Sequence, residues 1–324
     1  MKLFALHSSK IFGELIAEEL KLSLSKHEER EFEDGEHKIR PLENVRNQEI
    51  FVIHSLYSDA TQSVNDKLCR LLFFIGALKD ASAKKVIAVI PYLCYARKDR
   101  KTKPRDPVTT RYIARMFESS GADGIVTMDI HNLQAFQNAF TIPAENLDAR
   151  KLFAAYLVSI LKEEEPVIMS PDFGGVKRAE QFLETLSKKM NKELPFALME
   201  KYRSSGVVWG ERIAGEVSNK TVVIIDDMIG TGGTIARAAA ACKKAGAKKV
   251  LAFATHGLFT GKPDETLKEE ALRQIITTNT IPPFRLEQTK IKDKVTVLNA
   301  APLFAEAIKR IYEGGSIVEL LENE

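Results

Sequence analysis

Uninterrupted apolar runs are the clearest pattern along this chain. Residues 222–225 are β-branched and apolar without polar alternation, which is typical of a parallel strand that is covered on both faces. Other strand-like runs occur at residues 49–54, 85–90, 124–128 and 166–169. Segments between them carry apolar residues at helical spacing, as at residues 11, 15, 16 and 20. The pattern predicts an α/β protein with mostly parallel sheets flanked by helices.

The same succession of elements occurs twice. ALKDASAKKVIAVI at residues 77–90 matches ACKKAGAKKVLAFA at residues 241–254, and IFVIHS at residues 50–55 parallels VVIIDD at residues 222–227. Such self-similarity indicates two copies of one strand, loop, helix, strand unit. An amphipathic helix starts near Leu152, so we expect two tandem domains, residues 1–148 and 149–324.

An acid pair and a glycine-rich loop follow the apolar run of the second copy. Asp226 and Asp227 stand at the end of the predicted strand, where open α/β sheets bind their ligands. The loop Gly230, Thr231, Gly232, Gly233 and Thr234 then leads into an alanine-rich helix, and its backbone N–H groups suit an anion. Adjacent carboxylates repel an anion unless they bind hydroxyls or a metal. A sugar phosphate satisfies both parts, although a glycine-rich loop alone is often only a tight turn.

A dense basic run occupies residues 91–107, PYLCYARKDRKTKPRDP. Charge runs are usually solvated faces, but this one directly follows a buried strand and Pro91, which is the position of a ligand-binding loop. A polyphosphate is the expected counter-anion. Nucleic acid is the weaker alternative, because the chain has only this one compact basic run and no basic domain.

Candidate metal ligands follow two other predicted strands. Asp129 and His131 end the apolar run at residues 124–128, and Asp172 lies in the segment SPDFGG at residues 170–175. Oxygen-rich groups of this kind suit Mg2+. The alternative for Asp172 is a helix N-cap, since the segment leads into a helix.

Two cations, Lys201 and Arg203, lie in a stretch of small residues, EKYRSSG at residues 200–206. They form either a surface turn or a mobile clamp that closes on a transferring phosphoryl group. Their spacing leaves both interpretations open.

Composition excludes several classes of protein. The 47 lysines and arginines nearly balance the 44 acidic residues, with a formal net charge of +3, so neither nucleic acid nor a membrane surface is an expected partner. The longest apolar run, residues 71–78, is far shorter than the ~20 residues of a membrane span. The first ten residues turn polar too soon for a signal peptide. Three scattered cysteines indicate reduced thiols of a cytoplasmic protein.

Together these segments resemble the ribose-phosphate pyrophosphokinase family, over nearly the whole chain. FEDGE at residues 32–36 is similar to the family's FPDGE, YARKDRK at residues 95–101 to YARQDRK, and TMDIH at residues 127–131 to TMDLH. SPDFGGVKRA at residues 170–179, the KxR at residues 201–203 and DDMIGTGGT at residues 226–234 complete the main motifs. Further matches are THG at 255–257, TTNTIP at 277–282 and AEAIKRIYEGGS at 305–316.

The resemblance implies two domains of phosphoribosyltransferase type. It also implies transfer of a pyrophosphoryl group from Mg-ATP to the 1-hydroxyl of ribose 5-phosphate, which gives phosphoribosyl pyrophosphate and AMP for nucleotide biosynthesis. Mg2+ is the implied cofactor, and a homohexamer built from dimers is the implied assembly. The first domain is expected to bind ATP and to have lost the sugar site, because His54-Ser55 replaces the acid pair there.

The implied roles fall on four sets of residues. Asp226, Asp227, Gly230, Thr231, Gly232, Gly233 and Thr234 would bind ribose 5-phosphate; Arg97, Lys98, Asp99 and Arg100 would bind ATP, together with Phe32, Asp34 and Glu36 of a neighbouring subunit; His131, Asp172 and Asp129 would serve the metal; Lys201 and Arg203 would act in catalysis. Two alternatives are a phosphoribosyltransferase acting on a base and a non-catalytic regulatory homologue. The basic loop and the retained metal and clamp residues favour the kinase.

The chain departs from the family pattern at a few positions. Glu33 stands where the family has proline, Lys98 where it has glutamine, and Gly230 where aspartate is common. Asn47 takes the place of a glycine beside Arg46, and Ile317 follows Ser316 where a second serine is usual.

Overall fold

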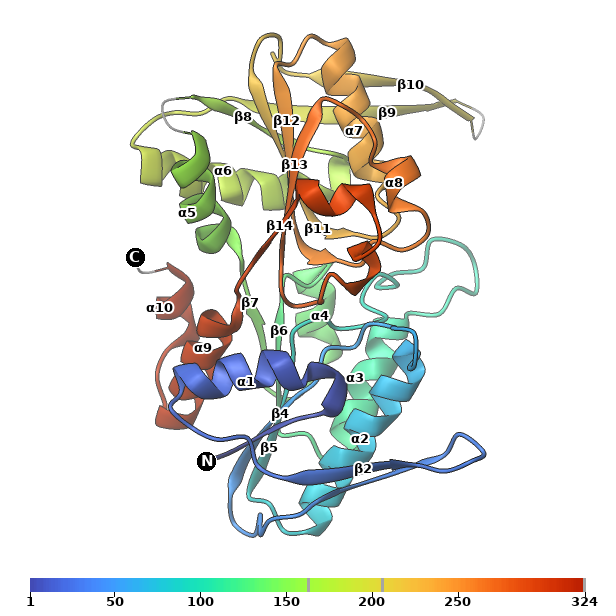
Figure 1. Ribbon diagram of the computed structural model, residues 1–324, viewed down its shortest axis with the longest axis vertical. Helices are drawn as coiled ribbons and strands as arrows, with labels where there is room; N and C mark the ends of the chain where they lie inside the picture. Colours follow the sequence, from blue (N-terminus) through green and yellow to red (C-terminus); the bar gives the residue numbers. More distant parts are fainter. Residues whose placement is uncertain (162–163, 205–206, 323–324) are drawn as a thin grey trace. The chain divides into compact units, whose positions relative to one another are not determined.

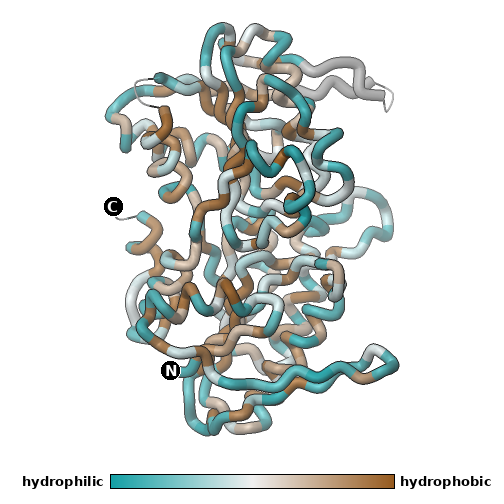
Figure 2. The backbone as a smooth tube through the Cα atoms, viewed as in Figure 1, coloured by the Kyte–Doolittle hydropathy of each residue, from teal (hydrophilic) through white to brown (hydrophobic). Residues whose placement is uncertain are grey.

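The computed structural model describes the backbone of residues 1–161, 164–204 and 207–322, and the side chains of these residues except 200–204 and 207–211. The chain forms two compact units, residues 1–148 with 300–324 and residues 149–299. Each unit has its own core of buried apolar side chains. The apolar stretches of the chain coincide with the strands and the inner sides of the helices (Figure 2).

The first unit contains a five-stranded sheet in which every neighbouring pair is parallel. Its strands, in spatial order, are β1 (Lys2–Ala5), β4 (Glu49–Ile53), β5 (Lys85–Ile90), β6 (Gly124–Met128) and β7 (Ala144–Leu147). An antiparallel hairpin of β2 (His27–Glu31) and β3 (His37–Pro41) forms a separate two-stranded sheet. The helices are η1 (His7–Ser9), α1 (Lys10–Glu19), α2 (Val64–Asp80), α3 (Thr109–Ser119) and α4 (Leu133–Ala139).

The last two helices, α9 (Ala301–Glu313) and α10 (Ile317–Glu322), belong to the first unit. This differs from the sequence prediction, which assigned residues 300–324 to the second domain. The physical reason is an apolar contact over a long sequence distance: α9 packs against α1, and the buried rings of Phe304 and Phe12 meet edge to face at 5.5 Å (Figure 1).

The second unit contains a seven-stranded sheet that is parallel except at one edge. Its strands, in spatial order, are β10 (Val207–Ala214), β9 (Phe196–Ser204), β8 (Pro166–Ser170), β11 (Thr221–Ile229), β12 (Lys249–Gly257), β13 (Leu272–Thr278) and β14 (Val295–Leu298). The helices are α5 (Arg150–Leu161), η2 (Phe173–Gly175), α6 (Val176–Met190), α7 (Gly233–Lys244), α8 (Pro263–Thr266), η3 (Phe284–Leu286) and η4 (Lys290–Lys294). Within this unit α5 and α6 lie on one side of the sheet, and α7 and α8 on the other (Figure 1).

The connections of this sheet reverse direction between β8 and β11. From β8 the chain passes through α6 to β9 on one side, whereas from β11 it passes through α7 to β12 on the other. In open α/β sheets such a reversal opens a crevice at the carboxyl ends of the two strands, and ligands bind there. The order of the first unit, β1-β4-β5-β6-β7, contains no such reversal.

Both units nevertheless follow one element order: strand, helix, hairpin, strand, helix, strand. In the first unit these are β1, α1, β2–β3, β4, α2 and β5; in the second they are β8, α6, β9–β10, β11, α7 and β12. The register of the central pair also agrees, with Val52 opposite Ala88 and Ile224 opposite Ala252. The predicted α/β repeat is therefore visible in the fold. The hairpin differs, because β9 joins the main sheet beside β8 while β2–β3 stays apart.

Local sequence explains where the main elements begin. Ser63 caps α2, since its hydroxyl accepts from the Asp66 N–H while the Asp66 carboxylate accepts from the Ser63 N–H. All five residues of β8 and the first five of β11 are buried, as expected for strands with helices on both faces.

The three cysteines are free, and Cys94 and Cys242 are buried. Burial raises the pKa of both thiols to about 12, so they remain protonated and unreactive at neutral pH. In the described part of the chain, every helix is too short or too polar to cross a bilayer.

The packing of α9 generates a test of the first unit. Phe304→Ala removes a fully buried ring and should lower the free energy of unfolding by about 3–5 kcal/mol, because a cavity remains between α1 and α9. Val318→Ala, at a side chain that is 61% exposed, is the matched control and should change it by less than about 0.5 kcal/mol. Denaturant titration measures both; equal effects would contradict the assignment of α9 to this core.

Candidate active site

The acid pair lies in the last four residues of β11, which continues to Ile229, two residues further than the sequence predicted. The Asp227 side chain is 3% exposed and that of Asp226 is 19% exposed. The Asp227 N–H donates to Asp226 Oδ1 at 2.9 Å. Arg178, on the first turns of α6, places Nη1 at 3.8 Å from Asp226 Oδ1 and 3.7 Å from Asp227 Oδ1. The guanidinium thus offsets part of the charge of two adjacent carboxylates.

The two carboxylates influence each other's ionisation. Burial and the neighbouring charge of Asp227 raise the pKa of Asp226 well above its ordinary value, and Arg178 only partly opposes this. A protonated carboxyl donates a hydrogen bond and an ionised one accepts, so the pair can serve both roles toward hydroxyl groups. Arg178 lies in the SPDFGGVKRA segment, but the sequence alone did not indicate that it reaches β11.

The glycine loop turns sharply between β11 and α7. Gly232 has φ of +84°, a left-handed conformation, and a Cβ there would lie 2.8 Å from the buried side chain of Leu267. The loop is anchored to the next connection, because the Thr260 N–H donates to the Gly230 carbonyl at 2.9 Å. Helix α7 then begins at Gly233 without a capping side chain and without an acid in its first turn. Its N-terminal N–H groups therefore suit an anion.

A hydroxyl and imidazole network supports the neighbouring strand ends. Met228 pairs with His256 on β12, and His256 Nδ1 lies 2.9 Å from Thr280 Oγ1. Thr278 Oγ1 donates to the Thr255 carbonyl at 2.8 Å. The family motifs THG and TTNTIP contain the buried Thr255, His256, Thr278 and Thr280, whose polar groups link the ends of β12 and β13.

Asp172 follows β8 at the same end of the sheet. Its Oδ1 accepts from the Gly175 N–H at 3.2 Å, and its carbonyl accepts from Ser170 Oγ at 2.6 Å. The side chain therefore caps η2, as in the N-cap alternative that the sequence analysis gave for Asp172. The cap fixes the carboxylate just after β8, the strand that pairs with β11 and so lies beside the strand of the acid pair.

Asp129 and His131 occupy the end of β6 in the first unit. Asp129 has φ of +40°, and its N–H donates to the Leu147 carbonyl at 2.9 Å. His131 is exposed. Asn132, the N-cap of α4, donates from Nδ2 to Asp99 Oδ2 at 2.5 Å, which connects this turn to the basic loop.

In the basic loop, two arginines are exposed to solvent and one lysine is paired with an acid of the same loop. Arg97 and Arg100 are exposed, whereas Lys98 Nζ lies 2.5 Å from Asp106 Oδ2 and 2.9 Å from Thr102 Oγ1. Lys98 and its hydrogen-bonding neighbours hold the pKa of Asp106 well below its usual range. The ammonium of Lys98 thus links the start of the loop to Thr102 and Asp106 further along it. The charge pattern did not predict this contact.

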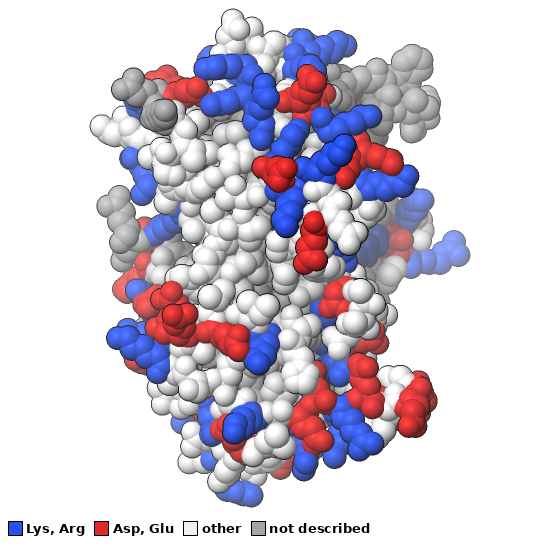
Figure 3. Space-filling model, viewed as in Figure 1, with Lys and Arg blue, Asp and Glu red and all other residues white. Residues whose placement is uncertain are grey.

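The hairpin tip carries Phe32, Asp34 and Glu36. The Phe32 N–H donates to the Glu36 carbonyl at 2.8 Å, and Asp34 Oδ1 accepts from the Glu36 N–H at 3.1 Å. Gly35 has φ of +88°, as the predicted Asp-Gly turn requires. Phe32 is 42% exposed, and acidic side chains gather at this tip (Figure 3).

The two proposed clamp residues lie on β9. The sequence placed Lys201 and Arg203 in a loop, but the backbone pairs them with Glu211 and Val208 of β10. Their side chains lie outside the described side chains.

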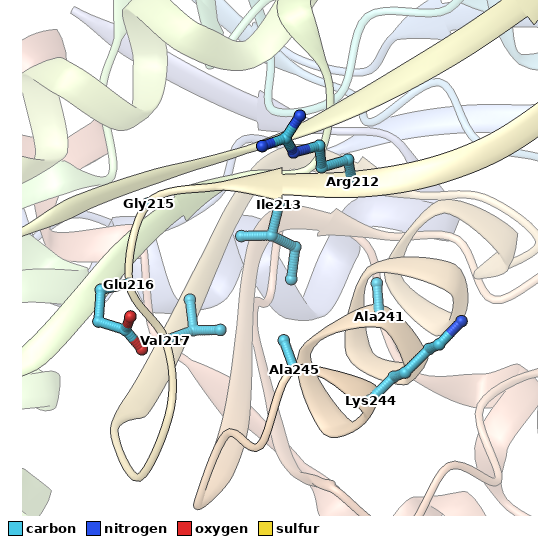
Figure 4. A pocket seen from close by; sticks show the side chains of 8 residues that line it. All are labelled: Arg212, Ile213, Gly215, Glu216, Val217, Ala241, Lys244 and Ala245. Carbon is cyan, nitrogen blue, oxygen red and sulfur yellow. The ribbon is translucent and has the colours of Figure 1, made fainter.

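A cavity of about 350 Å³ lies elsewhere in the second unit, between the end of β10 and the last turn of α7 (Figure 4). Ile213 and Val217 contribute apolar wall, and Lys244 and Glu216 lie at its margin. The glycine loop is at the opposite end of α7, so this cavity is separate from the acid pair.

The second unit therefore defines an α/β protein of phosphoribosyltransferase type, with an acid pair and a glycine turn beside a topological switch point. Residues 1–121 match the N-terminal domain of ribose phosphate pyrophosphokinase, and residues 184–322 match the phosphoribosyl synthetase-associated domain. The chain belongs to the ribose-phosphate pyrophosphokinase family.

Full-length relatives agree with this assignment. A ribose-phosphate pyrophosphokinase of Caldanaerobacter subterraneus is 40% identical over 99% of this chain and 97% of its own length. That of Clostridium acetobutylicum is 37% identical over 100% and 98%. The crystal structure of phosphoribosylpyrophosphate synthetase from Mycobacterium smegmatis superposes with a TM-score of 0.87 at 36% identity, covering 97% of this chain and 99% of that one.

The glycine turn generates a matched pair of variants. Gly232→Ala combines a left-handed backbone with a clash against Leu267, whereas Gly261→Ala has nearly the same φ, +80°, and nothing within 4 Å of the new Cβ. Backbone strain costs about 1–2 kcal/mol in both, and the clash adds about 1 kcal/mol or more in Gly232→Ala alone. Denaturant titration should show this difference in the free energy of unfolding. Equal losses would show that Leu267 does not restrict the turn.

The raised pKa of Asp226 predicts a pH-dependent stability. Because the folded state holds a proton that the unfolded chain releases above the ordinary pKa of 3.8, the stability of the wild type falls as pH rises through this range. Asp226→Asn removes that loss, so at neutral pH its free energy of unfolding should exceed that of the wild type. The advantage should vanish below pH 3.8. An advantage independent of pH, measured by denaturant titration across this range, would contradict the shift.

Proposed function

We propose how this chain carries out the reaction of its family. It forms phosphoribosyl pyrophosphate and AMP by transferring the β,γ-diphosphoryl group of ATP to the 1-hydroxyl of ribose 5-phosphate. The observation that carries the proposal is the acid pair beside the glycine turn at the reversal between β8 and β11. That crevice offers acceptors for hydroxyls and donors for a phosphate within one short segment, as a pentose phosphate requires.

Ribose 5-phosphate takes the second unit. Asp226 and Asp227 bind its ring hydroxyls, and Arg178 keeps the two carboxylates close enough to do so. Its 5-phosphate accepts N–H bonds from the turn of Gly230, Thr231, Gly232, Gly233 and Thr234 and from the first turn of α7. The left-handed Gly232 allows the backbone to approach the phosphate closely.

ATP binds to the first unit. Arg97 and Arg100 are exposed and supply positive charge for the polyphosphate, while Lys98 shapes the loop through Asp106. Asp99 is held by Asn132 and accepts from the nucleotide. Phe32, Asp34 and Glu36 reach the nucleotide of a neighbouring subunit from the hairpin tip. This arrangement rests on the proposed homohexamer built from dimers.

Mg2+ fits the donor set at the strand ends. The carboxylates of Asp172 and Asp129 are the hard oxygen ligands that this ion prefers, with His131 as a further partner. The cap on η2 fixes the Asp172 carboxylate at the end of β8, so it is already oriented for a cation. When bound, the ion neutralises phosphate charge. Asp172 in the second unit, and Asp129 with His131 in the first, would each serve Mg2+, directly or through its waters.

Phosphoryl transfer needs positioning and charge stabilisation more than covalent help from the protein. The acid pair and the turn hold the sugar so that its 1-hydroxyl oxygen attacks the β-phosphorus of ATP, and AMP leaves. Lys201 and Arg203 stabilise the charge that develops on the transferring group.

We also propose a cytoplasmic location, because all three cysteines are free thiols.

The proposal predicts AMP release only when ATP and ribose 5-phosphate are both present. Lys201→Ala combined with Arg203→Ala should lower turnover by at least ~10²-fold with little change in ribose 5-phosphate affinity, since the clamp acts mainly in the transition state. Lys262→Ala, at an exposed lysine of the second unit, is the control and should retain turnover. A coupled assay measures AMP. Near-normal turnover of the double variant would contradict the clamp. Transfer of ribose phosphate from phosphoribosyl pyrophosphate to a free base, with release of pyrophosphate and without ATP, would favour the phosphoribosyltransferase alternative.

A further inference from the structure

Three metal-ligand side chains meet in the first unit, and none of them is among the residues assigned above. His7 begins η1, directly after β1, while His27 and Glu29 lie on β2. Their ligand atoms all lie within 4.8 Å of one another. Among the residues that the structure describes, no other group of three or more histidines, cysteines or acids comes this close. We call these three residues the His-His-Glu cluster.

The distances suit a small metal ion. His27 Nε2 lies 2.9 Å from Glu29 Oε1, and His7 Nδ1 lies 3.7 Å from the same oxygen. A tetrahedral ion with ligand bonds of about 2.0–2.2 Å separates its ligand atoms by about 3.4 Å. These two separations lie on either side of this value, and the separation between the His7 and His27 ligand atoms is at most 4.8 Å.

Two of the three ligands are already held in place. The side chains of Glu29 and His27 are only 3% and 8% exposed, and the His27 ring packs against Phe4 and Phe74 at 6.2 and 5.5 Å. The His7 side chain is 61% exposed, so one side of the cluster faces solvent. The cluster therefore has two oriented ligands and a third at the surface. The side that faces solvent leaves room for an exchangeable fourth ligand such as water.

The charge of the cluster also suits a cation. Glu29 Oε1 accepts from the His7 N–H at 2.7 Å and lies 2.9 Å from His27 Nε2, so the carboxylate is held between the other two residues of the cluster. Arg70 lies on its other oxygen, with Nη1 at 3.6 Å from Oε2, and also donates to Glu31. Partners of this kind orient a ligating carboxylate without occupying its metal-binding oxygen.

We propose that His7, His27 and Glu29 bind a divalent transition metal such as Zn2+, distinct from the Mg2+ of the reaction. Two imidazoles and one carboxylate suit Zn2+ and Co2+, whereas Mg2+ prefers oxygen ligands. The metal replaces the hydrogen bond between His27 and Glu29. It joins η1 to the base of the β2–β3 hairpin, whose tip carries Phe32, Asp34 and Glu36, so occupancy of the site would restrain that hairpin.

Titration of the full-length chain with Co2+ and Zn2+ tests the proposal. Co2+ reports four-coordinate nitrogen and oxygen ligation by visible absorption, and calorimetry gives the Zn2+ affinity. His7→Ala removes one ligand at a side chain that is mostly exposed, so the fold should persist. Since even indirect partners of a metal contribute ~10–100-fold in affinity, loss of a direct ligand should weaken Zn2+ binding by at least ~10-fold.

His37→Gln is the matched control. His37 lies on β3 of the same hairpin and stacks on Phe73 at 5.3 Å, outside the cluster, so this variant should bind Co2+ and Zn2+ like the wild type. Zn2+ should also slow amide exchange at residues 27–31 in the wild type and not in His7→Ala. If the wild type and His7→Ala give the same Co2+ spectrum and the same Zn2+ affinity, the site does not exist.

Discussion

The second unit depends on keeping two adjacent carboxylates together at the edge of a low-dielectric core. Asp226 and Asp227 follow the five buried residues that begin β11, and burial makes their mutual repulsion costly. Arg178 offsets part of that charge, and proton retention by Asp226 relieves more.

The first unit shows what the same element order does without that constraint. At the end of β4, His54 takes the place of the first acid, is 1% exposed and has its Nδ1 3.3 Å from Ser9 Oγ. Burial and the nearby charge of Lys67 lower the pKa of His54 to about 3, so the ring stays neutral inside the core. The strand order of this sheet also contains no reversal. The two copies therefore differ both in the residues at the end of the central strand and in the order of the strands.

Local patterns predicted the strands and helices well, because apolar periodicity and capping act over a few residues. The run at residues 222–225 is part of β11, and Asp-Gly at residues 34–35 forms the hairpin turn. Contacts between distant segments were not predictable in this way. The join of α9 to α1, the Arg178 contact with β11 and the self-closure of the basic loop by Lys98 each depend on which surfaces meet.

The sequence by itself determined the α/β class, the internal repeat, the family and the residue types available for chemistry. These properties depend on periodicity, composition and motif order, which can all be read along the chain without knowing which segments meet. Only the tertiary structure decided that the sheet reverses between β8 and β11, that Asp172 caps η2, and that His7 meets His27 and Glu29. Such juxtapositions arise when separate elements bury their apolar faces against one another, and spacing along the chain does not encode them.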